Sequence, residues 1–143
     1  MICTFFGHRD TPKEIEPTLR STLTDLIENK NVNLFYVGTQ GNFDRMVYSQ
    51  LENLSTRYSI SYYKVLAYFP KEQVKVSDSA HTLLPDGFEK IYPRFAVNYR
   101  NMWMLKKSDY VVTYVTHAWG GAAKCRTLAE KQGKTVIDLC PIL

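Results

Sequence analysis

The sequence predicts a three-layer α/β fold of the Rossmann-like kind, with a mainly parallel sheet of five strands. Two observations predict it. Short apolar runs alternate with stretches of helical periodicity along the whole chain, and right-handed crossovers join such strands into a parallel sheet. The length of 143 residues corresponds to one domain, at roughly 100–200 residues per domain. We therefore expect residues 1–143 to form a single Rossmannoid domain.

The first half of the chain predicts three strands and two helices. Residues 1–6 form an apolar run that ends at Gly7, which is typical of a strand buried on both faces. The segment Thr11-Pro12-Lys13-Glu14 has the form of a capping box and predicts the start of the first helix. Residues 34–37 and 62–69 predict the second and third strands. Between them, a second helix is predicted by the apolar stripe Phe43, Met46, Val47, Leu51 and Leu54.

The second half begins with a long segment without periodicity. Residues 70–92 contain a turn signal, Pro85-Asp86-Gly87, and predict a lid, a binding loop or a disordered insertion, in which His81 is solvated. A third helix opens at Pro93, and residues 110–115 and 135–139 predict the fourth and fifth strands, with a last helix between them. The expected apolar positions of these two helices are Phe95, Tyr99, Met102, Trp103, Cys125, Leu128 and Ala129.

The composition excludes several classes of protein. Apolar residues make up 45% of the chain and charged residues 22%, which is ordinary for a globular domain and not for a disordered or fibrous protein. The formal charge of +4 is small and scattered, so we expect anionic small molecules rather than nucleic acid as partners. No membrane span or signal peptide is predicted, which favours a cytoplasmic protein. The aromatic content of 13% predicts rings that line a pocket or an interface between copies of the chain.

Three loops are predicted to meet at one edge of the sheet. In an open parallel sheet, ligands bind beyond the carboxyl ends of the strands. The loops after the first, second and fourth strands all carry glycine with polar or basic side chains, and their candidate ligand-binding residues are Gly7, His8, Arg9, Gly38, Thr39, Gly41, His117, Trp119, Gly120 and Gly121. Their convergence predicts a ligand site, although neither the dinucleotide-binding fingerprint nor the P-loop motif occurs.

Three features in or next to these loops suit a phosphate. The Gly120-Gly121 pair before a helix exposes N–H groups and the positive end of the helix dipole, although paired glycines can also make a simple tight turn. Lys124 in the first turn adds positive charge. Arg9 can hold a phosphate or carboxylate in a bidentate contact, or it can pair with Asp10.

The rings in the loops also allow two interpretations. His8 can donate to the same anion or act as a general acid or base, or it can form a structural hydrogen bond, and His117 has the same alternatives. Trp119 can stack on a base or cover the sheet edge.

Three polar residues on the predicted helices complete the candidate site. Asp44 either caps the second helix or receives a ribose hydroxyl, and capping is favoured. Arg100 and Asn101 lie amid apolar residues of the third helix, where an arginine needs a partner. That partner is a ligand phosphate, Asp109 or a backbone carbonyl, and the ligand is slightly favoured.

No catalytic or metal-binding constellation is predicted. Cys3, Cys125 and Cys140 lack metal-type spacing, and we expect them to be free thiols in apolar surroundings rather than nucleophiles. Paired carboxylates at the predicted site are missing as well. Catalytic residues and cofactors are therefore left unassigned, and no metal is expected.

The segments Cys3-Thr4-Phe5-Phe6-Gly7-His8-Arg9, Gly38 to Asp44, Arg100-Asn101-x-x-Met104 and Gly120-Gly121 together resemble the SLOG superfamily, in its YpsA-like branch of small bacterial and phage-borne proteins. The match spans nearly the whole chain, and the F-x-G-H-R opening is its most specific part. The superfamily includes the DNA-processing protein DprA, the LOG-type phosphoribohydrolases and sensor domains on a Rossmann-like fold. The resemblance implies a ligand that is a nucleotide or nucleotide-sugar.

Departures from the family pattern bear on catalysis. LOG enzymes carry P-G-G-x-G-T-x-x-E, whose glutamate assists cleavage of the N-glycosidic bond, and this chain has Thr127 at the glutamate position. We therefore expect a domain that binds or senses a nucleotide-derived phosphorylated ligand. The alternatives are a LOG-type nucleoside-monophosphate phosphoribohydrolase, with Asp44, Glu130 or His8 replacing the glutamate, and a DprA-like module that binds nucleic acid.

Overall fold

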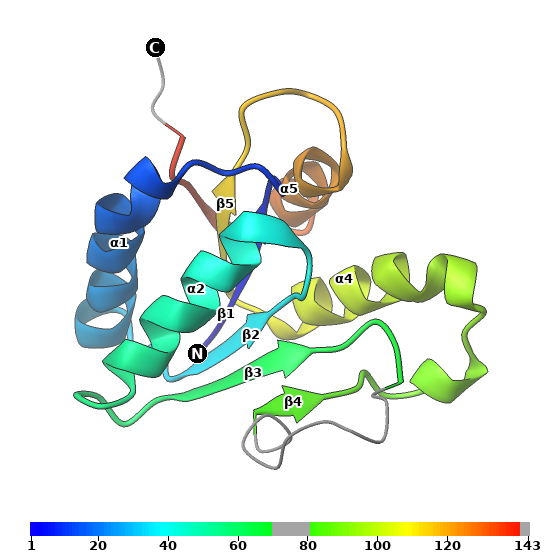
Figure 1. Cartoon of the computed structure of the whole chain (residues 1–143), viewed down its shortest axis with the longest axis horizontal. Coiled ribbons are helices and arrows are strands. Elements are labelled where there is room, and N and C mark those ends of the chain that lie inside the picture. The colour runs from blue at the N-terminus through cyan, green and yellow to red at the C-terminus, as the bar shows by residue number, and fades with distance from the viewer. Residues whose placement is uncertain (70–80, 141–143) are drawn as a thin grey trace.

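A computed structural model describes residues 1–69 and 81–140, and it confirms an α/β fold with helices on both faces of a parallel sheet (Figure 1). The strands are β1 (Ile2–Gly7), β2 (Leu34–Val37), β3 (Ser61–Val65), β4 (Thr82–Leu83), β5 (Tyr110–Tyr114) and β6 (Thr135–Asp138). The helices are α1 (Glu16–Asn29), α2 (Gly41–Leu54), α4 (Ala96–Lys107) and α5 (Gly121–Lys131), with short 3-10 turns at Lys13–Ile15, Phe88–Lys90 and Pro93–Phe95. Within the described residues, no helix is long and apolar enough to cross a membrane.

The strands lie in the order β4-β3-β2-β1-β5-β6, and every neighbouring pair is parallel. β1 has a partner on each side, since Thr4 pairs with Tyr36 of β2 and with Val111 of β5. The chain winds outward from β1 to β4, then returns to the other side of β1 for β5 and β6. This reversal is the topological switch point, the place where an open parallel sheet forms a crevice.

The prediction of five strands is wrong by one, because β4 lies in the segment expected to be a loop. It pairs with the end of β3, where the Leu66 N–H donates to the Leu83 carbonyl at 2.9 Å. A strand of two residues is too short to show a period in the sequence. Just before it, the His81 ring stacks on Tyr62 with centroids 4.4 Å apart, so His81 is not simply solvated. Residues 70–80 of the predicted loop lie outside the described residues.

Two apolar layers hold the helices on the sheet. α1 and α2 cover one face, and α4 and α5 cover the other (Figure 1). In β1, Cys3 and Phe5 belong to the core beneath α1 and α2, whereas Phe6 belongs to the core beneath α4 and α5. The unbroken apolar run at the start of the chain therefore encodes a central strand buried on both faces.

The predicted start of the first helix is wrong. The Thr11 hydroxyl donates to the His8 carbonyl at 2.5 Å, and α1 begins only at Glu16, after a 3-10 turn. Thr11 therefore closes the turn that follows β1 instead of capping a helix. The third strand is also shorter than predicted, since β3 ends at Val65.

The apolar face predicted for α4 is correct in part, since Met102 and Trp103 pack, partly buried, against the core beneath α4 and α5. Its buried side chains are Ala96, Arg100, Met104 and Leu105, whereas Phe95 lies just before the helix and is 49% exposed. Helical spacing alone favoured the large aromatic rings for the interior. Arg100 instead points inward, where its guanidinium donates hydrogen bonds to backbone and side-chain oxygens of other segments.

Gly7 provides a test of the packing between β1 and α2. A Cβ atom at Gly7 would lie 2.2 Å from Cγ of Phe43, a fully buried ring, so we expect Gly7→Ala to lower the free energy of unfolding by about 1–3 kcal/mol. A Cβ atom at Gly121 would meet nothing within 4 Å in the described part of the chain, so Gly121→Ala should leave stability unchanged or raise it by up to about 1 kcal/mol. Urea unfolding followed by circular dichroism measures both. Equal losses in the two variants would contradict the packing argument.

Candidate functional site

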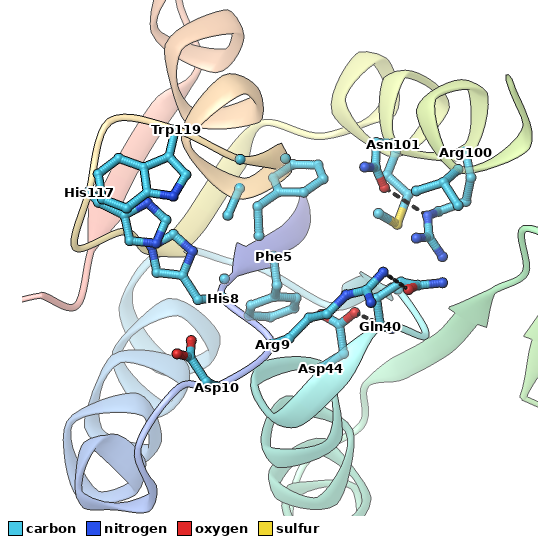
Figure 2. A pocket seen from close by; sticks show the side chains of 18 residues that line it. Phe5, His8, Arg9, Asp10, Gln40, Asp44, Arg100, Asn101, His117 and Trp119 are labelled. Carbon is cyan, nitrogen blue, oxygen red and sulfur yellow. Dashed lines mark hydrogen bonds between the residues drawn. The ribbon is translucent and has the colours of Figure 1, made fainter. Parts of the chain in front are cut away.

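A cleft of about 390 Å³ opens at the carboxyl edge of the sheet, beside the switch point. Its walls come from the loops after β1, β2 and β5, from α4 and from the first turn of α5 (Figure 2). The three loops that the sequence analysis selected therefore meet in space.

Most of the predicted site residues line this cleft: Gly7, His8, Arg9, Gly38, Asp44, Arg100, Asn101, His117, Trp119, Gly120 and Gly121. Thr39 and Gly41 line a neighbouring cavity instead, and Lys124 lines neither of the two. The sequence analysis did not select Asp10 and Gln40, which also line the cleft, although both stand in the loops it identified. The apolar lining residues Val97 and Met104 carry no signal that separates them from other apolar positions of a helix.

A column of three stacked rings forms one side of the cleft. His8 stacks on His117 with centroids 3.9 Å apart, and His117 stacks on Trp119 at the same distance. Trp119 lies at the outer end of the column and is 71% exposed, whereas His8 is buried at its inner end. Figure 2 shows the two histidines and the tryptophan on the same side of the cleft, opposite Arg100. The column thus presents an indole ring that is packed on one face and largely open to solvent.

His8 has a structural role in this column. The Thr116 N–H donates to Nε2 of His8 at 3.0 Å, which ties the loop after β5 to the loop after β1. Burial lowers the pKa of His8, and the neighbouring His117 lowers it further. A neutral ring with Nε2 as the acceptor fits both observations. Nδ1 of His117, in contrast, is buried without a hydrogen-bond partner among the described residues.

Arg100 is a buried cation on the opposite side of the cleft. It is only 2% exposed, and its guanidinium donates to the Val65 carbonyl at 3.0 Å and to the Thr39 hydroxyl at 3.3 Å. Its Nε donates to the Asn101 side chain at 2.8 Å. A backbone carbonyl is therefore a partner, whereas the alternative Asp109 is wrong, because that carboxylate accepts the Ile2 N–H. Within residues 1–69 and 81–140, no carboxylate lies within ion-pair distance of Arg100.

Asp44 and Gly38 lie close to Arg100 in the wall of the cleft. Asp44 accepts the N–H of Gln40, the residue before α2, at 2.8 Å, and this contact ties the first turn of α2 to the preceding loop without a side-chain cap on the N–H groups of the helix itself. Burial raises the pKa of Asp44 to about 6, against the opposing effects of the Gln40 hydrogen bond and the Arg100 charge. A Cβ atom at Gly38 would lie 2.8 Å from the Asp44 carboxylate and 3.3 Å from Cζ of Arg100. Glycine at this position allows both charged groups to approach the backbone of the loop.

The loops after β1 and β2 are tied together at Arg9. Its guanidinium donates a hydrogen bond to the Gln40 side chain at 2.7 Å, so the partner of Arg9 is Gln40 and not Asp10. Its carbonyl accepts the Asn42 N–H at 2.9 Å. Gly41 has φ of +87°, and a Cβ there would lie 2.5 Å from Cα of Arg9, so only glycine allows this approach.

The first turn of α5 completes the cleft. Gly120 precedes the helix with φ of +94°, and Gly120, Gly121 and Ala122 line the cleft. The first N–H groups of an α-helix have no partner within the helix and carry the positive end of its dipole. Lys124 lies on the exposed surface of α5 and adds no charge to the lining.

Thiol and metal chemistry have little support in the described residues. Cys3 and Cys125 are buried, as predicted, and burial raises the pKa of Cys125 to about 11. Neither is suited to act as a nucleophile near neutral pH. No group of three or more His, Cys, Asp or Glu side chains in the described residues is arranged to hold a metal ion.

No protein-family model matches the chain, and a comparison with curated proteins finds no match. The resemblance to the SLOG superfamily therefore stays a prediction that depends on the residues quoted above.

The raised pKa of Asp44 predicts a pH-dependent effect on stability. The native carboxyl binds its proton up to about pH 6, whereas in the unfolded chain it loses the proton near its usual 3.8, so this residue stabilises the fold below pH 4 relative to neutral pH. We expect Asp44→Asn to raise the free energy of unfolding at pH 8 by up to about 3 kcal/mol. The amide oxygen can still accept the Gln40 N–H. At pH 4 most of the gain should be lost, because the native carboxyl is protonated there.

Denaturant unfolding of wild type and Asp44→Asn at pH 4 and pH 8 measures this difference. Asp10→Asn is the matched control, because Asp10 lines the same cleft but is exposed. A gain from Asp44→Asn that is equal at the two pH values would contradict burial as its cause.

Proposed function

We propose that this chain is a SLOG-like Rossmannoid domain that binds a nucleotide-derived phosphorylated ligand in the cleft at the carboxyl edge of its sheet. The single observation that carries the proposal is the Trp119 ring, held on two stacked histidines beside the glycine-led start of α5. An aromatic platform next to unpaired helix N–H groups offers one surface for a base and another for a phosphate.

The charges around the cleft support the same ligand class. Arg9 lines the cleft. Its guanidinium, which donates a hydrogen bond to the Gln40 side chain, can also contact a phosphate. Arg100 is buried without a carboxylate within ion-pair distance in the described part of the chain, and an anion in the cleft would offset its charge. Asp44 is suited to accept a hydrogen bond from a sugar hydroxyl, because it lines the cleft and its carboxylate can accept more than the one hydrogen bond from the Gln40 N–H.

The stacking platform is tested by removing the indole. We expect Trp119→Ala to weaken binding of the best nucleoside monophosphate by roughly 5- to 100-fold, the range typical for loss of one base–aromatic stack. Trp119→Phe should retain most of the affinity. Tyr92→Ala is the matched control, since Tyr92 is 72% exposed, like Trp119, but does not line the cleft.

Isothermal titration calorimetry against the common nucleoside monophosphates measures these affinities. Binding by none of them, or equal losses in Trp119→Ala and Tyr92→Ala, would contradict the proposal.

A second candidate function is cleavage of the N-glycosidic bond of the same ligand, and the observation that favours it is Asp44. A carboxyl group with a pKa of about 6 in a cleft is partly protonated near neutral pH and can donate a proton to a leaving base. Glu130 is not suited to this role, because it pairs with Arg126 at 3.2 Å and lies outside the cleft.

Incubation with nucleoside monophosphates and chromatographic detection of free base tests this candidate. Base release that Asp44→Asn abolishes, while affinity for the monophosphate persists, would establish hydrolysis. Release that is equally fast in wild type and Asp44→Asn would exclude Asp44 as the acid, and no release would leave binding as the function.

A further inference from the structure

We infer that the cleft contains a pH-sensitive switch: a proton on His8 breaks the tie between the loops after β1 and β5, releases the loop that carries Trp119 and weakens binding in the cleft. This inference rests on the proposed function, because it concerns the regulation of the same site. It starts from one contact, the hydrogen bond from the Thr116 N–H to Nε2 of His8 at 3.0 Å.

This hydrogen bond exists only while His8 is neutral. A neutral imidazole has one N–H donor and one nitrogen that accepts, and here Nε2 is the acceptor, so the ring carries its proton on Nδ1. In the imidazolium both nitrogens carry protons. Nε2 then presents an N–H to the Thr116 N–H, and an attractive contact between the two loops becomes a repulsive one.

The loop after β5 depends on this hydrogen bond for its position. Among the described residues, it is the one hydrogen bond that joins residues 116–119 to another segment of the chain. His8 itself is fixed, because its carbonyl accepts hydrogen bonds from the N–H and the hydroxyl of Thr11 at 3.2 and 2.5 Å. When the contact is lost, the loop is therefore the part that moves.

The aromatic platform moves with this loop. His117 stacks on His8 and Trp119 stacks on His117, each with centroids 3.9 Å apart (Figure 2). Both outer rings of the column belong to the loop, and only its inner ring belongs to the segment after β1. A loop released from His8 thus carries the indole away from the position in which it lines the cleft.

The groups around His8 set the direction of the switch. Burial lowers the pKa of His8 below its usual 6.5 and the neighbouring His117 lowers it further, against the carboxylates of Asp10 in its own loop and Asp138 in β6. Asp138 is itself paired with Arg126 at 2.5 Å, which offsets part of its charge. The ring is therefore neutral near pH 7 in the closed arrangement.

Linkage then gives the pH range. A released and solvated His8 binds its proton near pH 6.5, whereas the closed arrangement binds it only at lower pH. The loop is closed above pH 6.5, and as the pH falls below that value protons favour the open form.

Two-dimensional ¹H–¹⁵N NMR of the free chain between pH 8 and pH 5 tests the switch without any ligand. We expect the amide proton of Thr116 to move upfield as the pH falls, with the same midpoint as the ring of His8. His8→Gln has an amide oxygen at about the reach of Nε2 but does not titrate, so its Thr116 amide should not follow this transition. Circular dichroism verifies that each variant stays folded over the range.

Asp44→Asn is the matched control, because Asp44 is the other buried group of the cleft with a pKa near 6. The transition at Thr116 should persist in this variant.

The effect on binding is measured by calorimetry with the best nucleoside monophosphate at pH 8 and pH 5.5. The phosphate of this probe also titrates near pH 6, so the comparison is between the two proteins. We expect the loss of affinity on acidification to be larger in wild type than in His8→Gln by roughly 2- to 12-fold, the equivalent of one hydrogen bond.

Three results would overturn the switch and leave the proposed function standing: a Thr116 amide that does not respond to pH, a response that persists in His8→Gln, or an equal loss of affinity in the two proteins. Tighter binding by wild type on acidification, absent from His8→Gln, also overturns it, since His8 would then contact the phosphate. Binding of no nucleoside monophosphate at any pH removes the proposed function and, with it, the effect on binding.

Discussion

The position of β1 between two parallel neighbours is the constraint on which the rest of this structure depends. Because β2 and β5 pair with opposite edges of β1, the chain must leave β1 toward one face and leave β5 toward the other. The two connections cannot close over the carboxyl end of the sheet, and a crevice opens between them. The hydrogen bond from the Thr116 N–H to His8 is the direct tie across that crevice, and the stacked rings of His117 and Trp119 extend outward from it.

Two charged groups stand in this crevice at a cost to stability. Arg100 and Asp44 are almost completely buried. Burial lowers the pKa of Arg100 and raises the pKa of Asp44, and each shift favours the neutral form of the side chain. A domain selected for stability alone would bury apolar side chains at these positions. Gly38 allows both groups to reach the same stretch of backbone, where the two cavities adjoin. Costly features of this kind cluster at functional sites in proteins.

The elements predicted most closely are those with the strongest pattern in the sequence. Residues 34–37 and 110–115 form strands at nearly the predicted bounds, because runs of β-branched and aromatic residues are typical of strands. β4 was not predicted, since its two residues gain their strand geometry from pairing with β3 and not from a pattern of their own. The face of α4 was assigned only in part for a related reason: Met102 and Trp103 pack against the core, but helical spacing also favoured the ring of Phe95, which lies before the helix and is exposed.

In the candidate site too, some features could be predicted from the sequence and others depend on tertiary packing. By itself, the sequence determined the fold class, the buried central strand and the three glycine-bearing loops, because these depend on local periodicity and on the known winding of parallel sheets. Only the tertiary structure decided that Thr39 and Gly41 line a second cavity, that Lys124 lines neither of the two, and that His8, His117 and Trp119 stack. Such relations join residues far apart in the chain, and side-chain direction at a loop or helix end depends on packing that no local pattern encodes.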